Sequence, residues 1–489
     1  MKNLNSNLIL HFKKPHNFGE ISCPDAAGKS DSPEFPGNII FTARINKNII
    51  RDIKFKASGC SYTIAAASYL TTLAKNKDIL KSTLITGKEI EKYLGKFPEE
   101  KRRVLDAATN TLQNLISDYI SKSHTENIYK KKNKKVAVAM SGGIDSSMVA
   151  KILKDNGWEI IGVTMKLLPY DSGWKDGAKT CCSPKDIEAA RKVSLKLGIP
   201  HVVINFIQPF EEKIINPFCL EYQQGRTPNP CVECNKYIKF GALLEKTKTL
   251  GASFLATGHY CRIKKSLNSG LYEIKKGLDK SKDQSYVLWK LNQDQISQIK
   301  TPIGMLSKDD VRKKANSIFP FLEKKNESQD ICFIPEDNFH SFLASKLKNI
   351  KEGAIINTNG KIIGTHKGYP FYTIGQRKGL GISHSKPLYV KEIIPEKNII
   401  MAGEEKDIMQ KSLKVKNTNF ISGNPPGNNF KAMVKIRYNF KETSAEIKIE
   451  SKKTAAIIFD KPQKAITPGQ SAVFYTGDTL IGGGVIIKS

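Results

Sequence analysis

The sequence predicts a multidomain protein. An α+β domain comes first, a doubly wound parallel α/β sheet follows, and two small β-rich domains end the chain, the last of them a β-barrel. The 489 residues are too many for one hydrophobic core. Apolar runs of strand length alternate with helix-length stretches between about residues 136 and 335, which is the pattern of a parallel sheet covered by helices. From about residue 336, short β patterns are separated by Gly and Pro.

We place the domain boundaries where these patterns change. The first domain takes residues 1–123, a basic linker takes residues 124–135, and the α/β domain takes residues 136–335. A small β-rich adaptor domain follows at residues 336–412, and the terminal barrel covers residues 413–489.

Individual elements follow from local periodicity. The first domain has strand patterns joined by Asn-Lys-Asn, which indicate a hairpin, and then two helical patterns, at residues 39–45, 49–55, 62–73 and 101–119. The α/β domain has strand-like runs at residues 136–140, 159–165, 201–206 and 253–257, and helical stretches at residues 148–153, 185–197 and 240–250. The last two domains have strand patterns at residues 353–356, 361–364, 388–393, 399–402, 431–438, 445–449, 454–459 and 471–475.

The composition indicates what kind of binding partner and which cellular compartment to expect. A formal net charge of +31 and a pI near 9.6 suit a polyanionic partner such as a nucleic acid, because neutralised phosphates supply affinity. Lys far outnumbers Arg, so a genome-wide codon bias is an alternative source of part of this charge. Nine Cys without a secretory segment indicate a reducing compartment, and no apolar run reaches membrane-spanning length. We expect a cytoplasmic protein with no membrane partner.

The apolar run at residues 136–140 leads into S-G-G-I-D-S-S at residues 141–147, the most informative stretch of the chain. Glycines let the main chain approach a ligand, and the N–H groups of a following helix start can point at an anion. The stretch therefore predicts a phosphate cradle, with a Ser-Gly turn capping an ordinary helix as the alternative. A G-x-x-x-x-G-K-[ST] loop is absent, which favours release of pyrophosphate over cleavage of a terminal phosphate. The candidate residues are Ala139, Met140, Ser141, Gly142, Gly143, Ile144, Asp145 and Ser146.

S-G-G-I-D-S-S after an apolar strand resembles the PP-loop of ATP pyrophosphatases, which adenylate an oxygen so that AMP can leave. The resemblance implies ATP as cofactor, and Asp145 beside the phosphates implies either a turn-orienting role or Mg²⁺. Ligands of such sheets collect at the carboxyl ends of the strands. Met165 would then lie near the adenine and Gly258 would let the nucleotide approach, although both could also be ordinary core and turn residues.

Three cysteines form the second strong signal. Cys231 and Cys234 have C-x-x-C spacing in residues 225–235, and Cys332 follows about a hundred residues later. Together with S-G-G-I-D-S-S, the stretches K-D-Q-S-Y at residues 282–286 and G-Q-R-K-G-L-G at residues 375–381 make the chain similar to the tRNA-specific 2-thiouridylase family. That resemblance implies an enzyme that thiolates tRNA, with catalytic candidates Cys234, Cys332, Cys231 and Asp145.

The sulfur chemistry has three alternatives. Many members of the family carry Asp where this chain has Cys231 and are described as passing a persulfide between the other two cysteines. Three thiolates could instead hold three irons of a [4Fe-4S] cluster and leave one iron open, with Cys231, Cys234 and Cys332 as ligands. A zinc site would need a fourth ligand, which the sequence does not offer at the usual spacing. We favour the cluster over the persulfide, and both over zinc.

Residues that could hold tRNA come from the same resemblance. The flexible loop at residues 375–381 carries basic side chains suited to an RNA backbone, and the family's barrel grips tRNA. The loop before the C-x-x-C pair would receive a flipped-out base. Each residue alone could be an ordinary surface residue. The candidates are Asn229, Pro230, Cys231, His259, Lys282, Asp283, Gln284, Arg377, Lys378, Arg437, Tyr438 and Gln470.

The first domain resembles the NifU/IscU-like iron-sulfur scaffold in framework but not in ligands. Where that family carries Cys-Gly-Asp this chain has P-G-N at residues 36–38, and K-R-R at residues 101–103 replaces its third Cys. Cys60 alone is kept, and a lone thiol cannot hold a cluster. The domain is either a scaffold or, as we favour, a degenerate docking domain that engages a sulfur donor or tRNA.

These observations predict ATP-dependent 2-thiolation of a tRNA wobble uridine, with tRNA and a sulfur donor, a cysteine desulfurase or a sulfur relay protein, as partners. Adenylation would convert the 2-carbonyl oxygen into a leaving group that sulfur displaces. Two rival functions are a PP-loop amide-forming ligase acting on a metabolite and a non-catalytic RNA-binding carrier of sulfur or iron-sulfur clusters.

Overall fold

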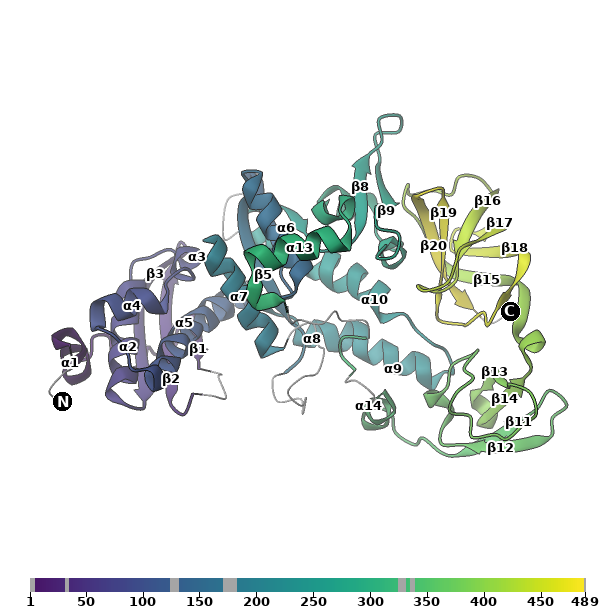
Figure 1. Cartoon of the computed structure of the whole chain (residues 1–489), viewed down its shortest axis with the longest axis horizontal. Helices are drawn as coiled ribbons and strands as arrows, with labels where there is room; N and C mark the ends of the chain where they lie inside the picture. The colour runs from purple at the N-terminus through teal and green to yellow at the C-terminus, as the bar shows by residue number, and fades with distance from the viewer. Residues whose placement is uncertain are drawn as a thin grey trace.

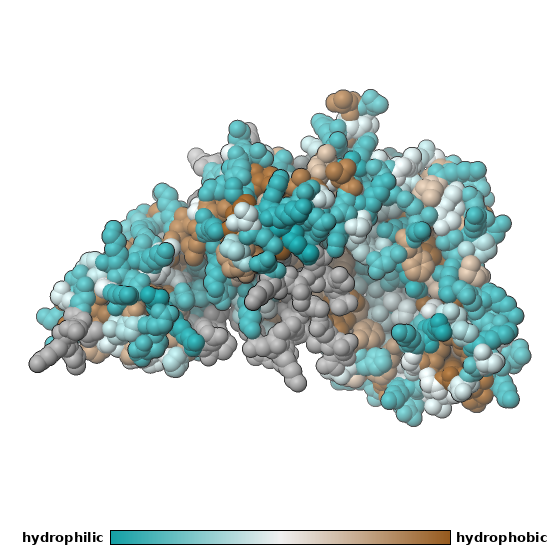
Figure 2. Space-filling model, in the orientation of Figure 1, coloured by the Kyte–Doolittle hydropathy of each residue, from teal (hydrophilic) through white to brown (hydrophobic). Residues whose placement is uncertain are grey.

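The computed structural model describes residues 5–30, 35–123, 132–169, 183–323, 331–334 and 339–487. The molecule is elongated, with the N-terminal domain at one end, the parallel sheet in the middle, and the barrel at the other end (Figure 1). The small β domain lies beside the barrel (Figure 1). The visible surface is mostly hydrophilic, with brown apolar groups scattered over several domains (Figure 2). Across the described ranges, no helix combines the length and apolar character needed to cross a bilayer.

The N-terminal domain is a three-stranded antiparallel sheet covered by helices. Strands β1 (Ala26–Lys29), β2 (Asn38–Asn46) and β3 (Ile49–Ser58) pair in that order, which confirms the predicted hairpin. Helices α2 (Ser61–Ala74) and α5 (Arg103–Lys122) confirm the two helical patterns and bury an apolar face on the sheet. The shorter helices are α1 (Ser6–Lys13), α3 (Ile79–Ser82) and α4 (Gly87–Leu94).

The central domain is a five-stranded sheet in the order β10-β7-β4-β5-β6, and every pairing in it is parallel. Val136 and Val138 face one core while Ala137 faces another, because successive side chains of a strand point to opposite faces. Helices therefore cover both faces, as the doubly wound prediction requires. The strands are β4 (Lys132–Ala139), β5 (Glu159–Lys166), β6 (His201–Asn205), β7 (Ala252–Ala256) and β10 (Ile299–Lys300), and the helices over one face are α6 (Ile144–Asp155), α7 (Pro184–Leu197) and α13 (Lys308–Ile318).

Two element boundaries in this domain differ from the prediction. The predicted linker at residues 124–135 extends too far, because β4 begins at Lys132; residues 124–131 lie outside the described residues. The Lys135 side chain is 4% exposed, and its Nζ lies 3.4 Å from the Glu159 carboxylate on the neighbouring strand. A lysine can therefore stand in this strand, because its aliphatic stem is buried and its charge lies beside a carboxylate. The helix predicted at residues 240–250 begins earlier, as a π-helix (Cys234–Leu243) that continues into α11 (Leu244–Thr249).

The two C-terminal domains are β-rich as predicted. Strands β11 (Gly353–Ile356), β12 (Ile362–His366), β13 (Tyr389–Ile394) and β14 (Ile399–Gly403) form a four-stranded sheet. The barrel closes because its first strand pairs with its last, and its strands are β15 (Met409–Phe420), β16 (Asn429–Lys435), β17 (Thr443–Ser451), β18 (Thr454–Lys464), β19 (Ser471–Thr476) and β20 (Thr479–Ile487). The strand predicted at residues 431–438 is too long, since β16 ends at Lys435 and the next residues turn toward the small β domain.

A hairpin from the central domain joins the barrel sheet. Strand β9 (Tyr272–Lys276) pairs with β20, and β8 (Cys261–Lys265) pairs with β9. The buried side chains of Tyr286 and Trp289 hydrogen-bond to Ser471 at the start of β19, at 2.8 Å and 3.0 Å. The barrel is therefore fixed to the central domain by a shared sheet and by buried aromatic residues.

Candidate functional site

The S-G-G-I-D-S-S stretch forms a tight turn between β4 and the N-terminus of α6. The Ser141 N–H donates to Ser146 Oγ at 3.2 Å, and the hydroxyls of Ser146 and Ser147 both donate to the Gly143 carbonyl, at 3.1 Å and 2.8 Å. The serines thus fix the turn, and the first N–H groups of α6 lie at its open end. Such a helix start is suited to an anion.

Of the two glycines in the turn, the one at position 142 cannot be replaced without strain by a residue with a side chain. It has φ of +69°, and a Cβ there would lie 2.2 Å from the Asp186 carbonyl oxygen of α7. Gly143 has φ of −88°, a value open to any residue, so its conformational freedom is not used. The turn therefore rests directly on the backbone of α7.

Asp145 is held by a buried lysine. The Lys308 Nζ lies 2.8 Å from each carboxylate oxygen, and the Tyr260 hydroxyl donates to one of them at 2.8 Å. The Lys308 side chain is 9% exposed, and its backbone N–H donates to Asp279 at 3.1 Å. Lys308 neutralises the carboxylate that would otherwise repel a phosphate at this helix start.

The Met140 carbonyl, just before the turn, is also held in place by a hydrogen bond from the neighbouring strand β5. The Thr164 hydroxyl donates to it at 2.7 Å, and the His201 Nε2 lies 2.8 Å from the same hydroxyl oxygen. Burial lowers the pKa of His201 to about 3, so its ring is neutral. Because the hydroxyl hydrogen is used on Met140, the Nε2–H of His201 donates to Thr164.

The two other predicted nucleotide residues lie at this edge of the sheet. Gly258 follows β7, and a Cβ there would lie 3.1 Å from the Asp145 Cβ and 3.3 Å from the Ser146 nitrogen. Its small size is thus already required by packing against the turn. Met165 is half-buried near the end of β5, where it pairs with Ile204 of β6. Nucleotide contact by either residue stays a prediction.

The cysteine loop lies against the barrel. Asn229 caps the short helix α10 (Pro230–Glu233), accepting from Val232 N–H at 3.3 Å; Cys231 is exposed and Cys234 is buried. Before it, the Thr227 N–H donates to Pro468 at 2.9 Å, and Gln470 Nε2 donates to the carbonyls of Thr227 and Pro228 at 2.9 Å and 3.1 Å. Gln470 therefore positions the loop, whatever else it binds.

Tyr438 borders the same loop. Its ring centroid lies 6.0 Å from that of Tyr286, and the Lys435 Nζ lies 5.5 Å from the Tyr438 ring centroid. Burial, followed by the nearby charges of Asp283 and Cys231, raises the pKa of Tyr438 to about 12. The structure thus brings the predicted residues Cys231, Asp283 and Tyr438 together.

The K-D-Q-S-Y segment connects the cradle with this loop. The Tyr260 N–H donates to Gln284 Oε1 at 3.1 Å, while its hydroxyl reaches Asp145. Asp283 is buried and accepts from the N–H groups of Gly277 and Ser285, both at 3.1 Å. Lys282 precedes it and is half-buried. Just after this segment, the Val287 carbonyl accepts from Asn235 Nδ2 at 3.3 Å, and Lys290 forms an ion pair with Glu233. Tyr260 and the stretch from residue 282 to residue 290 thus link the cradle to the cysteine loop.

Of the remaining residues predicted to bind tRNA, two make contacts inside the protein and two are exposed. His259 is 6% exposed, and its Nδ1 lies 2.8 Å from the Thr257 hydroxyl. The Arg437 guanidinium donates to the carbonyls of Ile374 and Ala465 at 2.9 Å and 3.0 Å, and so holds the loop of residues 375–381 against the barrel. On that loop, Arg377 and Lys378 are exposed. RNA contact by these residues stays a prediction.

Cys332 packs half-buried against the same apolar core as Cys234. Residues 324–330, which precede it in the sequence, lie outside the described residues. Within the described ranges, no group of three Cys, His, Asp or Glu side chains is arranged to hold a metal ion. Among the described residues, the three cysteines are therefore not already arranged around a metal position.

Cys60 lies at the N-cap of α2, with its Sγ 3.6 Å from the Thr63 hydroxyl. Burial raises the pKa of this thiol, but hydrogen bonds from Thr63 and from the N–H groups of Thr63 and Tyr62 outweigh that and lower it overall. The helix start thus favours the thiolate.

Sequence reasoning missed Lys308 and Tyr260. Lys308 stands in an ordinary capped helix start, S-K-D-D, which carries no sign of a distant carboxylate. Tyr260 comes three residues after the strand predicted at residues 253–257 and two after Gly258, so its place near a strand end is the one available signal. Only the fold brings both to Asp145.

Family models match four segments of the chain. They are a NifU-like N terminal domain over residues 4–126, a tRNA methyl transferase HUP domain over residues 134–336, a tRNA methyl transferase PRC-barrel domain over residues 340–404, and an aminomethyltransferase beta-barrel domain over residues 410–486. With the parallel sheet and the closed barrel, these matches confirm the predicted fold class.

Curated relatives match more than two thirds of the chain. The tRNA-specific 2-thiouridylase MnmA 1 of Caldanaerobacter subterraneus subsp. tengcongensis is 47% identical over 359 residues, 73% of this chain and 98% of that protein. The tRNA-specific 2-thiouridylase MnmA of Clostridium acetobutylicum is 45% identical over 72% of this chain and 99% of that protein. Among solved structures, the U34-tRNA thiolase NcsA of Methanococcus maripaludis matches 46% of this chain and 68% of its own at 20% identity, with a TM-score of 0.26.

We predict that Gly142→Ala destabilises the central domain by more than about 2 kcal/mol, since a left-handed backbone alone costs an Ala about 1 to 2 kcal/mol and the Asp186 contact adds to it. Gly157→Ala is the matched control, because Gly157 also has positive φ, of +74°, but no atom of the described chain lies within 4 Å of its Cβ position. Urea unfolding of both variants measures the difference. Equal losses would show that the turn does not rest on α7.

Proposed function

The chain belongs to the tRNA-specific 2-thiouridylase family, and from this premise we propose the reaction that its site performs: ATP-dependent replacement of the 2-carbonyl oxygen of a tRNA wobble uridine by sulfur. The single observation that carries the proposal is a chain of contacts between the phosphate cradle and the cysteine loop. Tyr260 bonds to Asp145 and to Gln284, and three residues after Gln284 the Val287 carbonyl accepts from Asn235, the residue after Cys234. ATP activation and sulfur chemistry need one shared substrate position, and these contacts hold the two halves side by side.

The proposed reaction has two steps. The uridine 2-oxygen attacks the α-phosphorus of ATP, and pyrophosphate leaves. Sulfur then forms a bond to C2, the C–O bond breaks, and AMP departs with the original oxygen. Adenylation is needed because an unactivated carbonyl oxygen is a poor leaving group.

The cradle would bind the phosphate groups that move in the first step. The N–H groups at the start of α6 supply dipoles fixed before the reaction, so they cost little reorganisation when charge moves to the leaving pyrophosphate. Lys308 adds a positive charge that is already desolvated. Asp145 offers the carboxylate oxygens that Mg²⁺ prefers, and Mg²⁺ bound there would replace the Lys308 contacts.

For the sulfur, we propose that Cys231, Cys234 and Cys332 hold a [4Fe-4S] cluster after rearrangement of their side chains. Soft thiolates are the ligands that such clusters take, and a fourth iron without a protein ligand would supply a binding position for sulfide. The alternative is a persulfide carried on Cys234 or Cys332, with Cys231 standing where many relatives have Asp.

We place the substrate tRNA across the face between the cysteine loop and the exposed basic loop. The flipped uridine would enter beside Asn229, Pro230 and Cys231, while Arg377 and Lys378 would contact the RNA backbone. A cysteine desulfurase or sulfur relay protein would supply the sulfur. We also keep the cytoplasm as the proposed location.

The proposed function is tested by incubating the purified chain anaerobically with unmodified tRNA, ATP and sulfide, and by measuring 2-thiouridine with nucleoside mass spectrometry. Asp145→Asn should abolish the product while tRNA binding stays unchanged, because the RNA contacts lie elsewhere. ATP consumption without tRNA would favour the amide-forming ligase, and tRNA binding without ATP turnover would favour the carrier. Retained thiolation in Asp145→Asn would remove the cradle from the mechanism.

Lys308→Met is predicted to lower kcat/KM for ATP about 100-fold, the order of magnitude seen when one preorganised electrostatic contact is lost. Met keeps the aliphatic stem, so the packing changes little. Lys308→Arg should recover part of the loss, and Lys313→Met, an exposed lysine of the same helix, should leave kcat/KM unchanged. Pyrophosphate release measures all three. A normal KM and kcat in Lys308→Met would contradict the role.

Cys231→Asp distinguishes the two sulfur routes. If three thiolates hold a cluster, this variant loses iron, visible absorbance and thiolation even under anaerobic conditions, because a hard carboxylate suits a soft cluster poorly. Cys23→Ser, a change at an exposed thiol of the first domain, is the control. An iron-free Cys231→Asp enzyme that is fully active with a persulfide-generating desulfurase would overturn the cluster and leave the thiolase function standing.

A further inference from the structure

Strand β6 is the edge of the catalytic sheet, and among the described residues one side of it has no strand as neighbour. On its inner side, the Phe206 N–H donates to Lys166 of β5 at 2.8 Å. The N–H groups of His201, Val203 and Asn205 point to the opposite, outer side of the strand. An edge with unpaired N–H groups needs cover, because buried donors without acceptors are costly and exposed edges invite other strands.

Side chains of the N-terminal domain accept these three hydrogen bonds. Val203 N–H donates to Ser117 Oγ at 3.2 Å, and Asn205 N–H donates to Ser121 Oγ at 3.4 Å. The third acceptor is the Thr83 hydroxyl, 3.4 Å from the His201 nitrogen. Ser117 and Ser121 are one helical turn apart on α5, a rise of about 6 Å, which is close to the roughly 6.6 Å spanned by two strand residues. A helix thus takes the place of a sixth strand.

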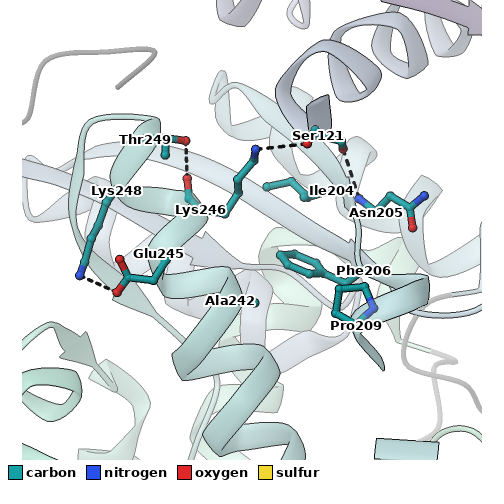
Figure 3. A pocket seen from close by; sticks show the side chains of 10 residues that line it. All are labelled: Ser121, Ile204, Asn205, Phe206, Pro209, Ala242, Glu245, Lys246, Lys248 and Thr249. Atoms are coloured by element: carbon teal, nitrogen blue, oxygen red, sulfur yellow. Dashed lines mark hydrogen bonds and ion pairs between the residues drawn. The ribbon is translucent and has the colours of Figure 1, made fainter. Parts of the chain in front are cut away.

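Further contacts fix α5 on this edge. The Arg191 guanidinium of α7 donates to Asn114 Oδ1 at 3.1 Å. Lys246 Nζ donates to the carbonyls of Ser121 and Ser123 at 3.4 Å and 2.5 Å, so a cation from the central domain caps the C-terminus of α5. Figure 3 shows Lys246, Ser121 and Asn205 along the pocket at this junction.

The apolar contacts are continuous across the same junction. Leu115, Ile116 and Ile120 of α5 belong to one buried cluster with Val202 and Ile204 of β6. Polar and apolar contacts therefore agree in placing α5 along the whole edge strand. A loosely tethered carrier domain would not bury its helix in this way.

The junction is also close to the phosphate turn. The backbone N–H of His201 donates to the Thr83 hydroxyl, and the His201 ring hydrogen-bonds to the Thr164 hydroxyl. That hydroxyl in turn donates to the Met140 carbonyl. Through the described residues, His201 and Thr164 thus connect the N-terminal domain to Met140, the residue just before the turn. Displacing the N-terminal domain would therefore loosen the support behind the cradle.

From this geometry we infer that the edge of the catalytic sheet is a docking surface fitted to the N-terminal domain of the same chain, and that this domain is a permanent structural part of the catalytic unit. Its α5 replaces the missing neighbour of β6 and holds the sheet that carries the phosphate turn. This role is separate from any sulfur or RNA binding by the domain and does not depend on the proposed reaction.

Hydrogen exchange of the full chain, read residue by residue with mass spectrometry, tests the docking. In the wild type, the amides of Val203 and Asn205 should exchange slowly for an edge strand. Ser117→Ala/Ser121→Ala should speed their exchange at least about 10-fold, because each loses its acceptor. Thr109→Ala is the matched control, since its hydroxyl bonds to carbonyls within α5 itself and its loss should leave β6 unchanged.

Because the double variant could fold poorly, each single serine variant is measured as well, and each should affect its own amide most. Unchanged exchange at Val203 and Asn205 in all the variants, or fast exchange already in the wild type, would overturn the docking. Neither result depends on whether the chain thiolates tRNA, so the two proposals fail separately.

Discussion

The ion pair between Asp145 and Lys308 is the interaction on which the rest of the site depends. A helix start attracts phosphate, yet the second residue of α6 is a carboxylate that would repel it. Burying Lys308 against both carboxylate oxygens removes the conflict, and it requires α13 to begin at the same sheet edge where β4 ends. The Lys308 side chain is 9% exposed and the Asp145 side chain 31% exposed, so the pair joins the start of α13 to the start of α6 at the rim of the sheet. The cradle, α6 and α13 therefore form a single unit.

No domain of the chain carries a complete site alone. Tyr260 reaches Asp145 with its hydroxyl and Gln284 with its backbone, and the segment after Gln284 is anchored on barrel strand β19 through Tyr286. Gln470 of the barrel in turn holds the loop before the cysteines. At the other end, α5 of the first domain covers the open edge of the sheet. In the proposed reaction, adenylation and sulfur chemistry would meet where these domains are packed together, so domain packing would set the geometry of the reaction.

Much of the fold could be predicted from the sequence, because it is expressed in local periodicity: the hairpin of β2 and β3, the strands β5 and β6 and the S-G-G-I-D-S-S turn all follow from patterns within a few residues. Long-range partners could not be predicted. Nothing near Lys308 in the sequence points to Asp145, and Ser117 and Ser121 look like ordinary polar helix residues until β6 lies beside them. Arg437 resembles an RNA contact in sequence, but the fold uses its guanidinium to hold the 375–381 loop. Whether the predicted residues bind nucleotide or tRNA depends on molecules outside the chain.

The central claim is that this cradle supports adenylation of a uridine oxygen and not cleavage of a terminal phosphate. Its most direct measurement is the nucleotide stoichiometry of one reaction, in which AMP, pyrophosphate, ADP, phosphate and 2-thiouridine are quantified together under anaerobic conditions with tRNA. The account predicts one AMP and one pyrophosphate for each thiouridine formed, with no ADP above the level without enzyme. ADP and phosphate formed in proportion to thiouridine would contradict it.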